Sequence, residues 1–125
     1  MVQVEISQLS GECNAWREKL RQYKEEFQQD EAQLRKVAGQ ALSKEQLQDV
    51  EHLHNQFHIQ LINIHDLKQA IKAHDRKINF EREANGSLAE ESFAEHERLH
   101  DELATLEQTF AEIRNEFAVF LKAAS

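Results

Sequence analysis

Apolar residues recur at alternating spacings of three and four along three long segments of this 125-residue chain. Such spacing places side chains on one face of an α-helix, which has about 3.6 residues per turn, whereas a strand would need a spacing of two. Stripes of this length are typical of helices that pack as in a coiled coil. The first stripe contains Ile6, Leu9, Cys13, Trp16, Leu20, Tyr23, Phe27, Leu34 and Val37, the second Val50, Phe57, Ile64, Ile71 and Ile78, and the third Leu99, Leu103, Leu106, Phe110, Ile113, Phe117 and Phe120.

Two short interruptions separate the stripes. Ser43 followed by Gln46 matches a capping box, in which two residues satisfy each other's free N–H groups at the start of a helix. Asn85-Gly86 is a strong helix break, and Ser87 followed by Glu90 matches a second capping box. We therefore predict helices over about 3–38, 44–84 and 88–123.

Short turns make neighbouring helices antiparallel. The predicted fold class is therefore all-α: an elongated up-down-up three-helix bundle with coiled-coil-like heptad packing. At this length we expect residues 1–125 to form a single helical-bundle domain.

Composition excludes several classes of partner. The chain has 23 acidic and 15 basic residues, a formal net charge of -8, which opposes binding to a phosphate backbone. No run of about 18 apolar residues could span a membrane, and the first ten residues lack the pattern of a secretory signal. Because the chain also has a single cysteine, Cys13, we expect a cytoplasmic protein that binds neither nucleic acid nor membranes.

Polar residues interrupt the apolar stripes at two levels. Asp30 and His54 are equally distant from the first predicted turn, and Asp75 and His96 are equally distant from the second. A buried carboxylate needs a partner, and a histidine at the same level can provide one. We therefore predict two buried polar layers, Asp30 with His54 and Asp75 with His96, each of which fixes the register of the helices.

The second layer also suggests a metal site. His96 and His100 are four residues apart, so both imidazoles can point from one face of a helix. Asp75, His74 or Cys13 could complete a tetrahedral shell for zinc or iron. A switch that depends on histidine protonation is a further reading of the same residues.

The stretch EHLHNQFHIQLINIH, residues 51–65, carries four of the seven histidines. His54 and His58 lie one turn apart and could chelate a metal ion together. His65 lies about 10 Å further along the helix axis and cannot join them, and His52 points to the opposite side. The four histidines are therefore not one site.

Two Glu-x-x-His pairs occur, Glu51 with His54 and Glu97 with His100. Ferritin-like di-iron proteins use two such pairs on facing helices, together with glutamates from two more helices. Here the pairs are about 25 Å apart in height and a fourth helix is missing, which argues against one di-iron site within a monomer. The segment EHERLHDEL resembles a helix of hemerythrin-like cation-binding domains, although no histidine in this chain is followed four residues later by glutamate.

The segment HDLKQA, residues 65–70, resembles the phosphoacceptor helix of histidine phosphotransfer domains, which are helical bundles of similar size. The resemblance implies that His65 would accept a phosphoryl group and that Lys68 would support it electrostatically. Gln69 stands where that family has a glycine, which keeps the histidine accessible.

Ile59 and Ile62 lie one turn apart on the outer face of the second predicted helix, more than about 100° from its stripe. An exposed apolar pair of this kind indicates a contact with a partner helix or a second copy. No glycine-rich phosphate loop or nucleophile elbow is present. We therefore predict a non-enzymatic interaction or scaffold module without a cofactor, self-associating as a homodimer; the alternatives are a metal-binding bundle and a histidine phosphotransfer-like domain.

Overall fold

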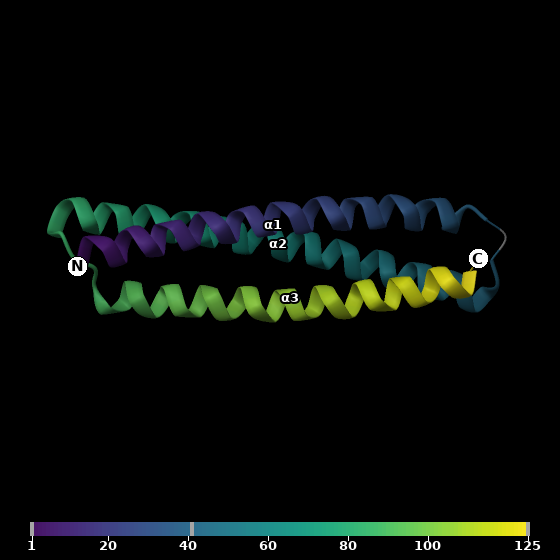
Figure 1. The fold of residues 1–125 in the computed structure, drawn as a ribbon. Coiled ribbons are helices and arrows are strands. Elements are labelled where there is room, and N and C mark those ends of the chain that lie inside the picture. Colours follow the sequence, from purple (N-terminus) through teal and green to yellow (C-terminus); the bar gives the residue numbers. More distant parts are fainter. Residues whose placement is uncertain (1, 41, 125) are drawn as a thin grey trace.

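The computed structural model describes residues 2–40 and 42–124, with side chains described from Glu5 onward. These residues form three helices, α1 (Val2–Ala38), α2 (Lys44–Asn85) and α3 (Glu90–Ala124), and contain no strand. The helices run up, down and up in an elongated bundle, with the N-terminus beside the α2–α3 turn and the C-terminus beside the α1–α2 turn (Figure 1). The predicted all-α three-helix bundle is confirmed. None of the helices described is both long and apolar enough to cross a membrane.

Both ends of α2 follow from local sequence. Ser43 Oγ accepts a hydrogen bond from the Gln46 N–H at 3.1 Å, and Gln46 Oε1 accepts one from the Ser43 N–H at 2.9 Å, which is the predicted capping box. At the other end Gly86 adopts a φ of 71°, and its N–H donates to the Arg82 carbonyl at 2.9 Å. Glycine has no Cβ to oppose this left-handed conformation, so the helix ends there.

The start of α3 differs from the prediction. The helix begins at Glu90, two residues later than expected, and the capping box proposed for Ser87 and Glu90 is wrong. The carboxylate of Glu81 on α2 accepts hydrogen bonds from the Ala89 N–H at 3.4 Å and from the Ser92 hydroxyl at 2.5 Å. A carboxylate suits a helix N-terminus because it satisfies free N–H groups and complements the helix dipole. The neighbouring helix therefore supplies the group that Ser87 was expected to provide.

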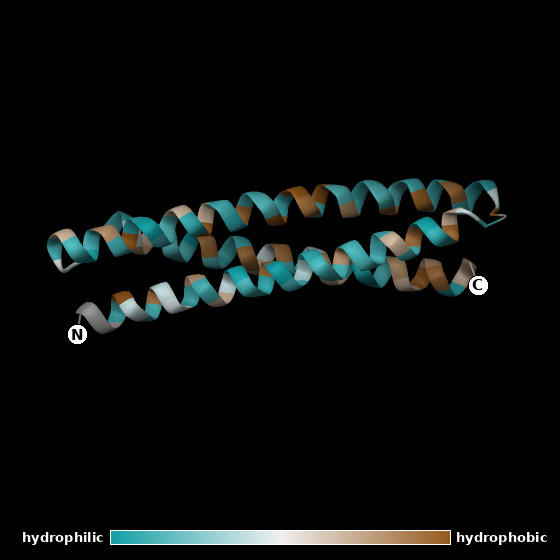
Figure 2. Ribbon diagram, turned by 90° about the horizontal axis from the view of Figure 1, so that it is seen from above, coloured by the Kyte–Doolittle hydropathy of each residue, from teal (hydrophilic) through white to brown (hydrophobic). Residues whose placement is uncertain are grey.

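The apolar stripes meet in one continuous core, and hydrophobic residues recur along all three helices (Figure 2). Its most aromatic part, here called the aromatic segment, consists of Tyr23, Phe27, Phe57, Phe110 and Phe117. Ring centroids are 4.7 Å apart for Phe27 and Phe110, 5.3 Å for Phe57 and Phe117, and 5.5 Å for Phe27 and Phe57. Edge contacts of this kind are favoured because the ring edge is positive and its face negative.

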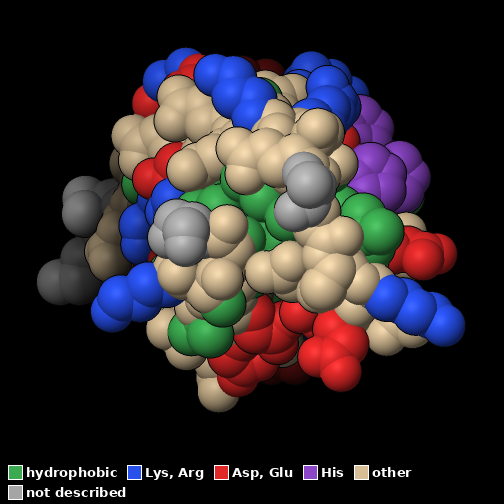
Figure 3. Space-filling model, turned by 90° about the vertical axis from the view of Figure 1, so that its right-hand side faces the viewer, with side chains coloured by type: hydrophobic (Ala, Val, Ile, Leu, Met, Phe, Trp, Pro, Cys, Tyr) green, Lys and Arg blue, Asp and Glu red, His purple; other side chains and the backbone are tan. Residues whose placement is uncertain are grey.

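The end of the bundle at the α1–α2 turn leaves part of the apolar interior visible (Figure 3). Hydrophobic side chains are visible there between the helix ends, and histidines gather on one flank (Figure 3). Leu53, Val119 and Phe120 border a hollow of about 360 Å³ between the start of α2 and the end of α3.

Candidate functional site

Asp30 is buried, but its partner is not the predicted one. Its carboxylate accepts hydrogen bonds from Arg114 on α3, from Nε at 3.0 Å and from Nη2 at 3.5 Å. His54 does lie near this level, but its side chain is 52% exposed and its Nδ1 is 3.9 Å from Glu31 Oε1. The predicted buried pair of Asp30 and His54 is therefore wrong. Successive helical residues point about 100° apart, so Glu31 can approach α2 while Asp30 faces α3.

The predicted pair of Asp75 and His96 fails for the same reason. Asp75 is half-buried and faces α1, where its Oδ1 accepts a hydrogen bond from Ser10 Oγ at 2.7 Å and its Oδ2 lies 3.5 Å from Arg17 Nη2. The preceding residue, His74, faces α3 instead. His96 is buried as expected, and its partner is His74.

Cys13, His74 and His96 form a buried group, here called the His–Cys cluster, to which each helix contributes one side chain. Their exposed fractions are 0%, 4% and 6%. One potential ligand atom from each residue lies within 4.8 Å of the other two. His74 Nε2 and His96 Nδ1 are 3.0 Å apart, which is hydrogen-bonding distance.

This hydrogen bond satisfies only one nitrogen of each imidazole. One ring donates and the other accepts, and the remaining nitrogens, His74 Nδ1 and His96 Nε2, have no hydrogen-bond partner among the described residues. His96 Nε2 does lie 3.5 Å from Glu12 Oε1, a distance for an ion pair, but without the geometry of a hydrogen bond. A buried polar atom left without a partner costs about 1–3 kcal/mol. The cluster is therefore a place where the core loses stability.

Burial opposes charge on His74 and on Cys13. Burial, and next the neighbouring His96, lower the pKa of His74. Burial, and next the carboxylate of Asp75, raise the pKa of the Cys13 thiol to about 12. At neutral pH the thiol is protonated and is not a reactive nucleophile.

The remaining metal candidates lie outside this cluster. His100 has a side chain that is 60% exposed, with Nδ1 3.3 Å from Asp101 Oδ1, although it is only one turn from His96. The Trp16 ring packs against His96 with centroids 4.5 Å apart and lies 6.1 Å from the His100 ring. Glu97, His100 and Asp101 form a second, exposed group of possible ligands. The structure thus places His74, His96 and Cys13 together and leaves out His100 and Asp75.

His65 is exposed and borders a hollow of about 310 Å³ between α1 and α2. Gln69 lines it too, together with four cationic side chains: Arg17, Lys24, Lys68 and Lys72. Sequence reasoning identified only Lys68 of these four. Arg17 and Lys24 reach this hollow from α1 because the two helices pack together. Their height along the bundle, counted from the first turn, could have indicated this.

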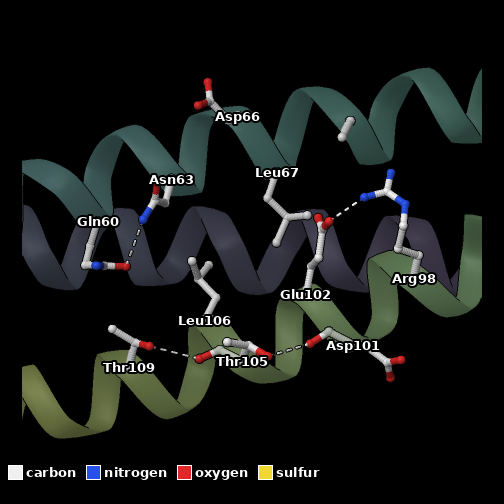
Figure 4. A pocket seen from close by; sticks show the side chains of 11 residues that line it. Gln60, Asn63, Asp66, Leu67, Arg98, Asp101, Glu102, Thr105, Leu106 and Thr109 are labelled. Carbon is white, nitrogen blue, oxygen red and sulfur yellow. Dashed lines mark hydrogen bonds and ion pairs between the residues drawn. The ribbon is translucent and has the colours of Figure 1, made fainter.

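A larger groove of about 670 Å³ lies between α2 and α3 (Figure 4). Its polar side chains bond mainly to their own helix: Asn63 donates to Gln60, Arg98 pairs with Glu102, and the Thr109 hydroxyl donates to the Thr105 carbonyl. Asp66 points away from the other labelled side chains in Figure 4. Among the described lining residues we find no nucleophile paired with a base, and no sequence pattern had indicated this groove.

Ile59 and Ile62 lie on the surface, 46% and 48% exposed. Phe80 is 71% exposed and lies on the same side of α2, because the 18 residues from Ile62 to Phe80 make about five full turns. We call these three residues the outer α2 face. The degree of exposure of Phe80 emerges from the packing of the helices.

No protein-family model matches this chain, and searches of curated proteins and of solved structures gave no match.

Proposed function

We propose that the chain is a non-enzymatic interaction module that pairs with a second copy of itself through the outer α2 face. The supporting observation is the exposure of Ile59, Ile62 and Phe80 on the side of α2 turned away from the core. Single exposed apolar residues are ordinary in proteins, but these three share one face of α2. Ile62 and Phe80 are about 27 Å apart along the axis, so a second long helix lying along this face would cover all three.

Antiparallel pairing of two α2 helices suits this surface. A two-fold axis would pass between the two outer α2 faces, at the height of Ile71 along the helix. It would bring Ile62 level with Phe80 of the second copy, and Asp66 level with Arg76 of the second copy. Asp66 and Arg76 are both exposed. A two-fold interface repeats every pairing, so it would contain two apolar pairs and two pairs of opposite charge. The patch is small, so we expect a dimer that dissociates in roughly the micromolar range.

Sedimentation equilibrium over roughly 1–100 µM tests the proposal. We expect a dimer that Phe80→Glu converts to a monomer, while Val119→Glu has no effect, because Val119 is 62% exposed on α3 and lies outside the outer α2 face. Asp66→Arg and Arg76→Asp should each weaken the dimer, and the two together should restore it. A monomer at the highest concentration, or a dimer indifferent to Phe80→Glu, would contradict the proposal.

A second candidate function is acceptance of a phosphoryl group by His65. The favouring observation is the exposed imidazole beside four cationic side chains in a chain whose net charge is -8. Such cations attract phosphate by charge and by charge-assisted hydrogen bonds.

Phosphoramidate, a small phosphoryl donor, tests this second function. Its P–N bond would break as a new bond forms to an imidazole nitrogen of His65, and ammonia would leave. Mass spectrometry should find one phosphoryl group per chain, lost in His65→Gln and kept in His58→Gln, where another exposed histidine of α2 is removed. Equal modification of both variants, or none of the wild-type chain, would exclude a role for His65.

A further inference from the structure

We propose that Cys13, His74 and His96 bind a divalent metal ion of the zinc class, which would join the three helices at one point. This inference is independent of the self-association proposed above, since the ligands lie inside the core and the outer α2 face lies on the surface. The ligand set is one thiol and two imidazoles, the groups that zinc prefers among protein side chains.

The distances suit a tetrahedral ion. Two nitrogen ligands on a tetrahedral zinc ion, each about 2.0 Å from the metal, are separated by about 3.3 Å. His74 Nε2 and His96 Nδ1 are already 3.0 Å apart, and one ligand atom of each of the three residues lies within 4.8 Å of the other two. Small side-chain movements would therefore admit a metal ion between the two nitrogens, and the hydrogen of the donating imidazole would move to the other nitrogen of that ring.

A metal ion would also explain the unpaired nitrogen of His96. An imidazole that binds a metal through one nitrogen usually donates its other N–H to a carboxylate, which orients the ring. Glu12 Oε1 lies 3.5 Å from His96 Nε2, on the side away from His74. In the metal-free pair, His96 Nε2 carries a proton only if His96 Nδ1 accepts the hydrogen bond from His74. A metal ion at Nδ1 would fix that tautomer, so Nε2 would always be a donor facing Glu12.

A hollow reaches one residue of the site, His74, from one side of the bundle. This hollow of about 420 Å³ lies between α2 and α3 and is lined by His74 together with Lys77, Glu91 and Glu95. The two carboxylates outnumber the one ammonium group, so the charge of this hollow favours the approach of cations. With three protein ligands, the fourth position of a tetrahedral ion would be filled by water from this hollow.

The competing explanation is a metal-free pair of histidines that only fixes helix register. The two explanations differ in the role of Cys13, which contributes only packing in a register pair but becomes a ligand in a metal site. Burial raises the pKa of the Cys13 thiol to about 12, so a metal ion that binds it at neutral pH must displace a proton.

Titration of the untagged, reduced and metal-free chain with Co²⁺ tests the site. Cobalt bound to a thiolate gives a near-ultraviolet charge-transfer band, and Trp16, the only tryptophan, is a built-in reporter because its ring lies 4.5 Å from His96. We expect one equivalent of Co²⁺, a thiolate band, quenching of Trp16 fluorescence, release of about one proton and displacement by Zn²⁺.

Variants locate the ion. Cys13→Ser should remove the thiolate band, and His96→Gln should weaken binding more than about a hundredfold, since loss of an outer partner alone weakens it by about 10–100-fold. Glu12→Gln should give that smaller loss. His100→Gln, one turn from His96 but exposed, should bind as the wild type does.

Absence of stoichiometric binding to the wild-type chain would overturn the proposal whatever the variants do. A second result would also overturn it: the wild-type chain binds Co²⁺ but shows no thiolate band, and His100→Gln abolishes this binding. The ion would then sit at the exposed group of Glu97, His100 and Asp101. Circular dichroism of each variant separates loss of a ligand from loss of the fold.

Discussion

The aromatic segment and the His–Cys cluster are two levels of the same core, about 20 Å apart along α1. Both contain planar rings contributed by different helices, and most of their side chains are buried. In the aromatic segment each ring meets another ring edge or face at 4.7–5.5 Å. In the His–Cys cluster the rings carry nitrogens, and two of these have no hydrogen-bond partner among the described residues. The same packing of three helices therefore produces one level that stabilises the fold and another level whose imidazole nitrogens are available to bind a ligand.

The largest expected effect belongs to the aromatic segment. Phe57 is 0% exposed and contacts Phe27 and Phe117, so Phe57→Ala should lower the free energy of unfolding by about 3–5 kcal/mol through lost burial and a cavity. Urea denaturation measures this. Val119→Ala is the control, since Val119 is 62% exposed, lies outside the outer α2 face, and its truncation should change stability by no more than about 0.5 kcal/mol. Equal effects of the two substitutions would mean that the aromatic segment is not the core.

A smaller effect is expected where a buried charge does have its partner. Arg114→Ala leaves the Asp30 carboxylate, with a side chain 12% exposed, without its cation, and should cost about 1–3 kcal/mol. Arg35→Ala provides the comparison, because Arg35 is 72% exposed in its pair with Glu31 and such helical pairs contribute about 0.3–0.5 kcal/mol. If thermal melts of the two variants coincide, Asp30 is hydrated and does not belong to the core.

Acid should lower the free energy of unfolding through the titration of the His–Cys cluster, whereas the phenylalanines of the aromatic segment do not titrate. The folded state lowers the pKa of His74 below its unfolded value of about 6.5, so the unfolded chain binds the proton first as the pH falls. The contribution of His74 to stability is therefore complete above about pH 6.5 and is lost below it, by at most about 1.4 kcal/mol per pH unit. His96, Glu95, Asp75 and Lys77 act on the same imidazole. Denaturation of the metal-free chain at several pH values should show a shallower loss for His74→Gln, and identical slopes would exclude His74 as the titrating group.

Local features of this bundle could be predicted from the sequence. The start of α2 at Ser43 and its end at Gly86 depend on residues within one turn, and both were correct. The heights of residues in the bundle also followed from counting along the antiparallel helices: His74 and His96, and Phe27 and Phe57, lie at nearly matching heights.

The directions of individual side chains could not be predicted in the same way. A shift of one residue rotates a side chain by about 100°, which decides whether Asp75 or His74 faces α3. Asp30 could be paired with Arg114 only by knowing on which side of α1 the third helix lies. For the same reason His54 was expected inside and lies outside. The sequence thus indicated which residues could make a site, and the packing of three helices selected Cys13, His74 and His96 from them.

Direct contact between His74 and His96 inside the core is tested most directly by a double-mutant cycle on the metal-free chain. His74→Leu, His96→Leu and the double variant would be compared by urea denaturation, which gives the coupling free energy between the two positions. We expect a favourable coupling of about 0.5–1.5 kcal/mol, and a double variant more stable than either single one, because only the double variant removes every unpaired nitrogen. Strictly additive effects would contradict the contact and, with it, the arrangement of the His–Cys cluster.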